Sequence, residues 1–558
     1  MAMFALAGML LVTGCGTAAQ SAGAQSSAAQ SAAVQSADAD ETSVTETTGS
    51  GAAATASDIV TAASDIDPAD QFTERDLAGT YDSKNAETID LDSCAEGETV
   101  TLTEESVYIF SGTLTNGQIV VEAGDTEKVQ IVLNGVTMVN DDSACIFVKS
   151  ADKVFVTLAK GTENHLSDTG SEYVQTDSGS TVDGVIFSRE DIVLNGEGSL
   201  TIEANYANGI VGKDDLKITG GTYTITAANK GIQANDSIRI YDGTIAIDVS
   251  DDAIHTDNDE TAGKGYIYIY GGSFSIRAGD DAIHAATALL ITEGDIDIQE
   301  SYEGLEGDTV DVTGGNIDIK ASDDGINAAI GLASDSIGQE AMMQMPSGGM
   351  TAPTDGTMPT PAEGMTPPTD GTMPTPPEGM TPPTDERTVQ GGAFPGGKGR
   401  NGGFGGRGGM AFEAEPAACI RITGGTIHVD ASGDGIDANG TIYIDGGEVI
   451  VEGTTNSGNG PIDFAVGAEI NGGTFIASGA SGMAEGFTGG SQYSVRYIFG
   501  SKVAADTEVT VTDEDGREVL AYTSDKEYSA IIFSTPDLKE GTYTITAGGQ
   551  TDTVTVSG

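Results

Sequence analysis

The sequence of 558 residues contains no tryptophan, only four cysteines, and 24 Lys and Arg residues against 86 Asp and Glu residues. The resulting net charge of −62 repels the phosphates of nucleic acids and of anionic lipid surfaces. We therefore exclude nucleic acid as a partner and expect cations instead. Aromatic residues make up only 6% of the chain, which disfavours ligand binding on a flat aromatic platform.

The few cysteines form no recognisable framework. Cys94, Cys145 and Cys419 follow an N-terminal Cys15 without the close spacing of a thiolate zinc site, and their odd number argues against a set of disulfides. Cys145 and Cys419 each precede an isoleucine of a strand pattern. We interpret them as small buried apolar residues.

The N-terminal region matches a bacterial lipoprotein signal. Residues 1–14 are apolar and end in Leu-Val-Thr-Gly before Cys15, so we predict a signal peptide over residues 1–15 and lipidation of Cys15. These residues carry no Lys or Arg, so the usual basic start is missing and the true start can lie upstream. Residues 16–70 are rich in Ala, Ser, Gln and Thr, which predicts a disordered tether. We expect an extracellular protein on the bacterial surface, held to the cell membrane by its lipid alone, since no other segment is long and apolar enough to span a bilayer.

A repeat dominates the rest of the chain. Its anchor is a small residue followed by an aliphatic one, and 21 or 22 residues separate most neighbouring anchors. A period of this length indicates a stacked repeat architecture. The anchors are Gly209-Ile210, Gly231-Ile232, Ala253-Ile254, Ala282-Ile283, Gly304-Leu305, Gly325-Ile326, Gly435-Ile436 and Pro461-Ile462.

Within each copy the apolar residues alternate, as in Ile238-Arg239-Ile240 and Ile267-Tyr268-Ile269, which is the period of a strand. Glycine turns such as Gly220-Gly221 recur in register. Three short strands per copy predict an all-β fold, a right-handed single-stranded parallel β-helix of about eleven coils. A set of separate β-sandwiches is the alternative.

Composition sets the predicted domain boundaries. The β-helix covers residues 71–330 and resumes over residues 416–490. Between them, residues 331–415 form a Met-, Pro- and Gly-rich insertion that we expect to be disordered. Longer strand patterns in residues 491–558 predict a small antiparallel β cap, since the open end of a stack needs cover.

Acidic residues stand just before the anchors of the middle copies, and stacking would bring their carboxylates to about 5 Å from one another. Hard oxygen ligands of this kind suit Ca²⁺, although a merely solvated acidic turn is the alternative. The predicted metal ligands are Asp251, Asp252, Asp280, Asp281, Glu303, Asp323 and Asp324.

The anchor residues themselves predict a shallow trough. We expect the small residues to form a bare row that faces outward, beside a polar row in which an extended polymer could lie. The predicted carbohydrate-binding residues in the polar row are Gln233, His255, His284 and Asn327. Two ordinary surface histidines are the alternative for His255 and His284.

Several segments together resemble the bacterial carbohydrate-binding β-helix lipoproteins. They are Phe72-Thr73-Glu74-Arg75-Asp76-Leu77, Ile131-Val132-Leu133-Asn134-Gly135-Val136, Asp214-Asp215-Leu216, the repeated Asp-Asp-Ala-Ile-His and Phe533-Ser534-Thr535-Pro536-Asp537-Leu538. The resemblance implies a pectate-lyase-like fold that binds calcium and polysaccharides such as polygalacturonate or cellulose. It transfers no individual ligand residue.

Three functions stay open from the sequence. The first is a non-catalytic surface protein that uses calcium to hold an acidic, polygalacturonate-like polysaccharide. The second is a calcium-dependent polysaccharide lyase with Lys230 as the base. A salt bridge from Lys230 to Asp252 and Asp281 is the alternative role of that residue, and the one that we favour. The third is an adhesin or cell-wall spacer without a glycan site.

Overall fold

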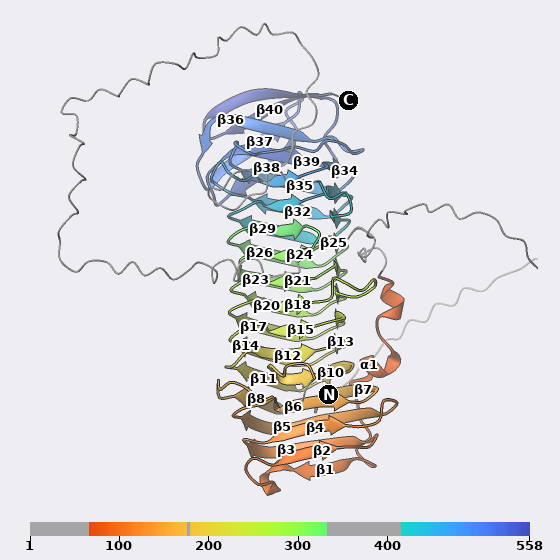
Figure 1. The fold of residues 1–558 in the computed structure, drawn as a ribbon. Helices are drawn as coiled ribbons and strands as arrows, with labels where there is room; N and C mark the ends of the chain where they lie inside the picture. The colour runs from red at the N-terminus through yellow and green to blue at the C-terminus, as the bar shows by residue number, and fades with distance from the viewer. Residues whose placement is uncertain (1–65, 176–178, 332–413, 558) are drawn as a thin grey trace, which may run out of the picture. The chain divides into compact units, whose positions relative to one another are not determined.

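Short parallel strands stack coil upon coil in the computed structural model, which describes residues 66–175, 179–331 and 414–557 (Figure 1). These residues belong to one unit, residues 54–558. The predicted signal peptide with Cys15, most of the tether and most of the insertion lie outside the described residues. None of the described helices is long and apolar enough to cross a membrane.

One face of the stack is a 12-stranded parallel sheet, which we call sheet B. It contributes one strand to each coil, so the count is close to the predicted eleven. The first coil was missed because Thr99–Leu102 lacks the anchor pattern. The strands are β2 (Thr99–Leu102), β4 (Gln118–Glu122), β6 (Ile146–Ser150), β9 (Gly184–Ser188), β12 (Asn208–Gly212), β15 (Ile232–Ala234), β18 (Ile254–Thr256), β21 (Ile283–His284), β24 (Leu305–Gly307), β27 (Ile326–Ala328), β30 (Ile436–Ala438) and β33 (Ile462–Phe464).

A second face begins with β1 (Glu87–Asp90), β3 (Val107–Thr115) and β5 (Lys128–Asn140), and β5 pairs with both β7 and β8. From β5 the pairing divides into two parallel ladders. The ladder that starts at β7 comprises β7 (Lys153–Leu158), β10 (Ile192–Gly196), β13 (Asp215–Ile218), β16 (Ser237–Ile240), β19 (Tyr266–Ile269), β22 (Ala288–Ile291), β25 (Thr309–Val312), β28 (Cys419–Ile422), β31 (Thr441–Ile444) and β34 (Gly467–Ile470).

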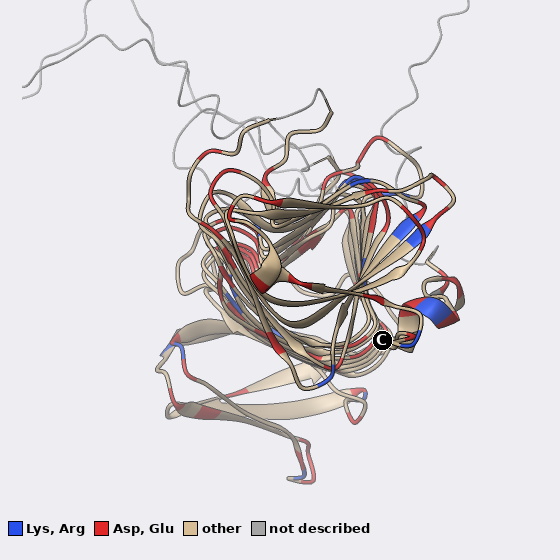
Figure 2. Cartoon of the chain, turned by 90° about the horizontal axis from the view of Figure 1, so that it is seen from below, with Lys and Arg blue, Asp and Glu red and all other residues tan. Residues whose placement is uncertain are grey.

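The third face is the ladder that starts at β8. Its strands are β8 (Glu163–Asp168), β11 (Ser199–Ala204), β14 (Thr222–Ala227), β17 (Thr244–Val249), β20 (Ser273–Arg277), β23 (Asp295–Ser301), β26 (Asn316–Ala321), β29 (Thr426–Ala431), β32 (Glu448–Glu452) and β35 (Thr474–Gly479). Figure 2 looks along the stack, so that the three faces enclose the core. The prediction of an all-β parallel β-helix is thus confirmed, and the right-handed winding stays a prediction.

The core consists of columns of like side chains, which explains why the repeat folds this way. In sheet B, Ile232 pairs with Ile254, and Ile254 pairs with Ile283. All three are completely buried, and each buried aliphatic side chain contributes about 1.5 to 3 kcal/mol. The anchor isoleucine therefore sets the register of every coil.

The stack ends in antiparallel strands, as predicted. Strand β39 (Tyr528–Ser534) pairs antiparallel with β35 and with β36 (Val495–Val503). A separate antiparallel sheet follows, made of β37 (Thr507–Thr512), β38 (Glu518–Ser524), β40 (Gly541–Ala547) and β41 (Gln550–Val556). Because β39 uses the edge of β35, that edge is covered.

A short helix, α1 (Glu74–Ala78), packs against the ladder that starts at β7. Its Asp76 is buried and bonds the Lys217 ammonium at 2.9 Å, and its carbonyl oxygen accepts a hydrogen bond from the Thr219 hydroxyl at 2.6 Å. The helix begins with a capping box between Thr73 and Asp76 and ends at Gly79, whose φ of 56° lies in the left-handed region. Two 3₁₀ turns, Pro68–Asp70 and Leu91–Ser93, complete the N-terminal part.

Candidate cation and carbohydrate site

Two rows of polar side chains run along sheet B. The first, which we call the inner acidic column, stands two residues before each anchor aliphatic residue and comprises Asp252, Asp281, Glu303, Asp324 and Asp434. The second, the polar row, follows each anchor aliphatic residue and is paired in register from coil to coil. It comprises Gln233, His255, His284, Glu306, Asn327 and Asp437.

Each carboxylate of the inner acidic column has a structural task. Asp252 Oδ1 accepts the backbone N–H of Asp281 at 2.9 Å, and Asp281 Oδ1 accepts that of Glu303 at 3.1 Å. Asp324 Oδ1 accepts the N–H of Asp434 at 2.6 Å. In Asp252, Asp281 and Asp324 one oxygen therefore ties a coil to the next, while the second oxygen remains available for a charge partner.

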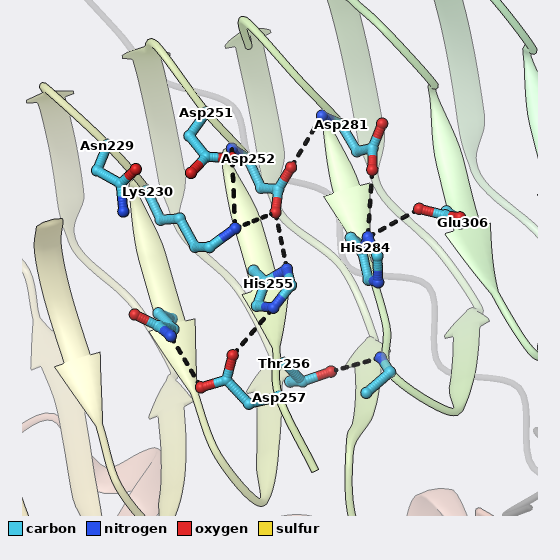
Figure 3. A network of polar contacts seen from close by, with 12 residues as sticks. Asn229, Lys230, Asp251, Asp252, His255, Thr256, Asp257, Asp281, His284 and Glu306 are labelled. Carbon is cyan, nitrogen blue, oxygen red and sulfur yellow. Dashed lines mark hydrogen bonds and ion pairs between the residues drawn. The ribbon is translucent and has the colours of Figure 1, made fainter. Parts of the chain in front are cut away.

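In the middle coils that partner is a histidine (Figure 3). Asp252 Oδ2 lies 2.8 Å from Nδ1 of His255, and Nε2 of His255 lies 3.0 Å from Asp257 Oδ1. Lys230 pairs with the same Asp252. Burial by itself raises the pKa of Asp252, but the hydrogen bond with His255 and the Lys230 charge lower it below its usual value. This carboxylate is therefore ionised and compensated.

The next coil repeats the arrangement with less compensation. Nδ1 of His284 lies 3.2 Å from Asp281 Oδ2 and 2.7 Å from Glu306 Oε2, so one imidazole serves two carboxylates. Burial and the charge of Glu306 raise the pKa of Asp281 well above its usual value. Burial opposes protonation of His284, but Glu306 and Asp281 raise its pKa well above the usual value. A single imidazole thus lies between two carboxylates, which remain only partly compensated.

The last coils have no such partner. Ligand atoms of Asp324, Asp434 and Asp437 lie within 4.8 Å of one another, and all three residues are buried. Among residues 66–175, 179–331 and 414–557, no Lys, Arg or His forms an ion pair with them. Burial and the charges of Asp434 and Asp323 raise the pKa of Asp324 to about 8, and burial and Asp463 raise that of Asp434 to about 7.

The difference between these coils lies three residues after the acid. Asp252 and Asp281 are followed by His255 and His284, whereas Asp324 is followed by Asn327, and Asp434 by Asp437. Neutral asparagine and anionic aspartate cannot balance a carboxylate. The residue three positions after the acid therefore determines whether the carboxylate has a cationic partner.

The donor chemistry separates the possible metal sites. The group of Asp324, Asp434 and Asp437 offers only carboxylate oxygens, which fits a hard divalent cation such as Ca²⁺. The groups that contain His255 or His284 mix nitrogen with oxygen and already hold positive charge, so they suit calcium less well. A further acidic group, Asp251, Asp252 and Asp280, shares Lys230.

The structure brings the predicted residues together but corrects the trough. Cβ atoms added at Gly209 and Gly304 would lie 2.7 and 2.4 Å from the core atoms Ile225 Cγ2 and Ile319 Cγ2, so the bare row faces the interior. His255, His284 and Asn327 are buried, and Gln233 is half-buried. The prediction of an open trough is therefore wrong. The small residues pack against the core, and neighbouring carboxylates cover the polar row.

The predicted carbohydrate-binding side chains of Gln233 and Asn327 already donate hydrogen bonds to neighbouring carboxylates. Gln233 Nε2 donates to Asp257 Oδ2 at 2.8 Å, and Asn327 Nδ2 donates to Glu303 Oε2 at 2.9 Å. Burial and the charge of Glu306 raise the pKa of Glu303 well above its usual value. In contrast, Asp251, Asp280 and Asp323 are half-buried and reach the surface, so they are better placed to meet a large ligand.

Lys230, the base of the lyase hypothesis, lies in a salt bridge. Its ammonium is 3.3 Å from Asp251 Oδ1 and pairs with Asp252, and the residue is 7% exposed. Two carboxylates thus hold this buried ammonium in ion pairs. This geometry favours the structural alternative for Lys230.

Sequence reasoning missed four site residues. Asp257, Glu306, Asp434 and Asp437 belong to the clusters. The signal for three of them was present, because Glu306, Asp434 and Asp437 occupy the same repeat positions as the predicted residues. Asp257 lies two residues after His255 and just beyond the end of β18, outside the two repeat columns that the prediction followed.

Comparisons with known proteins show similarity over part of the chain. Residues 96–338 match a family model described as "Carbohydrate-binding domain-containing protein". A curated protein of the same description from Acetivibrio thermocellus is 42% identical over 146 residues, which are 26% of this chain and 51% of that protein. The match thus spans about half the length of the curated relative.

Among solved structures, the chain is similar to the "polysaccharide lyase-like protein from C. thermocellum, Gadolinium derivative", at 35% identity and a TM-score of 0.36. That similarity covers 44% of this chain and 97% of the other. Over residues 96–338 the chain is thus similar to the carbohydrate-binding domain-containing proteins, the kind of protein that its sequence resembles.

Proposed function

We propose that this protein holds an acidic, polygalacturonate-like polysaccharide along sheet B through bound calcium, without cleaving it. The observation that carries the proposal is the group of Asp324, Asp434 and Asp437, three buried carboxylates without a cationic partner among the described residues. Like charges at this separation repel one another strongly in a buried site. A divalent cation removes that repulsion.

The buried carboxylates and the half-buried carboxylates would have different roles. Calcium held by Asp324, Asp434 and Asp437 would be buried and would join consecutive coils. Asp251, Asp280 and Asp323 are half-buried, so cations held there can keep a coordination position open for a carboxylate of the glycan. Bound calcium supplies positive charge where the protein alone, at −62, repels an anionic polymer.

Binding is favoured over cleavage by the state of Lys230. A lyase needs a basic side chain that is free to remove a proton, and Lys230 pairs with both Asp251 and Asp252. The other part of the proposal concerns location. A lipid on Cys15 and the following tether would present the stack outside a bacterial cell, where such a polymer is met.

One assay separates the three functions. The protein is incubated with insoluble polygalacturonate, with calcium or with a chelator, while co-sedimentation and the ultraviolet absorbance of unsaturated product are followed. We expect co-sedimentation only with calcium and no product. Product would establish the lyase, and neither binding nor product would leave a spacer.

Matched variants locate the surface. Asp251→Asn/Asp280→Asn removes two outer carboxylates, and Asp295→Asn/Asp297→Asn removes two exposed charges from β23 on another face. We expect the first pair to weaken calcium-dependent co-sedimentation about tenfold and the second to leave it unchanged. Equal behaviour of the two would contradict the assignment of sheet B.

A further inference from the structure

A cavity of about 420 Å³ lies at a corner of the stack other than the one that carries the inner acidic column. The end of α1, residues 77–79, forms one wall, and the turns of three successive coils form the rest at residues 196–198, 219–222 and 242–244. These turns join the ladder that starts at β7 to the ladder that starts at β8. The volume falls in the range of about 300 to 1,000 Å³ that is typical of ligand sites.

Backbone rather than side chains lines much of this cavity. Gly196 and Gly221 have φ values of 108° and 103°, and a Cβ atom at Gly196 would lie 2.2 Å from the carbonyl oxygen of Leu158. The N–H groups of Gly220 and Gly221 donate to no other described residue. The cavity therefore offers backbone donors that no side chain covers.

Three side chains add polar groups with open capacity. Thr222 and Thr244 are register partners on adjacent coils and are exposed, and their strands lie about 4.8 Å apart. Asp242 is exposed, and its Oδ1 accepts the Gly243 N–H while no described residue donates to Oδ2. The row of donors and acceptors matches a ligand that carries many hydroxyl groups.

Apolar surface lies beside these polar groups. Leu77 of the cavity wall is 40% exposed. Pyranose rings combine apolar C–H faces with a polar rim, and this mixture of surfaces suits them.

The local charge decides between glycans. Asp242 and Glu197 border the cavity, and Lys160, the partner of Glu197, already compensates that carboxylate. No Lys or Arg lies among the cavity-lining residues. An anionic sugar would be repelled, whereas a neutral one is not.

We propose that this corner is a second carbohydrate site, which binds a neutral pyranose oligosaccharide without a metal ion. It is independent of the calcium-dependent function proposed for sheet B. Hydroxyl groups of the ligand bond to Asp242, Thr222, Thr244 and the Gly220-Gly221 amides, while a sugar face packs against Leu77.

Isothermal titration tests the site with the full chain in a chelator. The probes are neutral glucan and xylan hexasaccharides and, for comparison, a galacturonate hexasaccharide. The variant is Asp242→Ala/Thr244→Val, and the matched control is Glu448→Ala/Thr426→Val, which removes the same kinds of group from exposed positions on distant coils.

We expect the wild type to bind at least one neutral probe in the chelator and not the acidic one. Loss of the two side-chain contacts should raise the dissociation constant about tenfold or more, while the control binds as the wild type. The variant should also keep its calcium-dependent co-sedimentation with polygalacturonate, which shows that it is folded and separates the two sites. No binding of either neutral probe by the wild type, or equal binding by the variant, would overturn the proposal.

Discussion

Asp324 and Asp434 are 110 residues apart in the sequence, yet the backbone N–H of Asp434 donates to Asp324 Oδ1 at 2.6 Å. This contact joins the coil before the Met- and Pro-rich insertion to the coil after it. The same two side chains belong to the uncompensated acidic group with Asp437. One contact thus links the continuity of the stack to its candidate cation site.

Removal of charge from this group should weaken calcium binding without loss of stability. In Asp324→Asn/Asp437→Asn we expect calcium affinity to fall about tenfold or more, because two of three anionic ligands become neutral. The melting temperature without calcium should stay the same or rise, since buried repulsion is relieved. Calorimetric titration and thermal melts measure both effects.

The control for that variant is Asp295→Asn/Asp297→Asn, which removes the same charge from the exposed surface of β23. It should keep the calcium affinity and the calcium-induced rise in melting temperature. An unchanged affinity in Asp324→Asn/Asp437→Asn would instead show that calcium binds elsewhere.

The insertion should be dispensable for the stack. The backbone N–H of Ile330 donates to Glu415 Oε2 at 2.8 Å, so the two ends of the described chain lie close together and a short linker can join them. We expect replacement of residues 332–413 by a few Gly and Ser residues to leave the melting temperature within about 2 °C of the wild type. A large loss of stability would show that residues 332–413 contribute contacts to the fold.

The buried pair of Asp76 and Lys217 should fix α1 to the stack. Their side chains are 1% and 6% exposed, and removal of one partner leaves the other charge buried and unpaired. Asp76→Ala should therefore lower the free energy of unfolding by about 3 to 5 kcal/mol, as measured by chemical denaturation. Asp82→Ala, at an exposed site in the following loop, is the control and should change stability by less than about 0.5 kcal/mol.

The ion pairs of His428 should make the melting temperature of the protein depend on pH. Its ring lies 3.9 Å from Glu452 and 3.3 Å from Asp318, and these carboxylates, Glu452 foremost, raise its pKa to about 9. A folded-state pKa above the unfolded value stabilises fully below the unfolded pKa, near pH 6.5, and this stabilisation is lost as the pH rises through about 9. His428→Gln should therefore lower the melting temperature more at about pH 6 than at about pH 10. An equal loss at both values would refute the ion pair.

The periodic part of this fold was predictable because each coil repeats the same local rules. Ile254 pairs with Ile283 as their equal positions in the repeat require. The direction of the glycine row was not predictable. Gly209 and Gly304 sit at the corner where a strand enters sheet B, and only the packing of Ile225 and Ile319 against them shows that they face inward.

The site was predictable in its columns but not in its charges. The sequence aligns Asp252, Asp281 and Asp324 alike, and alternation alone places His255 on the outer side of its strand. Burial of His255 comes from Asp252 and Asp257, which lie three residues before it and two residues after it in the same coil. The repeat pattern lists these residues, but it does not show that the backbone on both sides of the strand folds their carboxylates over the ring.

Anomalous diffraction from crystals grown with calcium tests the central claim most directly. The account predicts an ion coordinated by the carboxylates of Asp324, Asp434 and Asp437. Density for calcium at other residues only, or no calcium in the crystal at all, would contradict it.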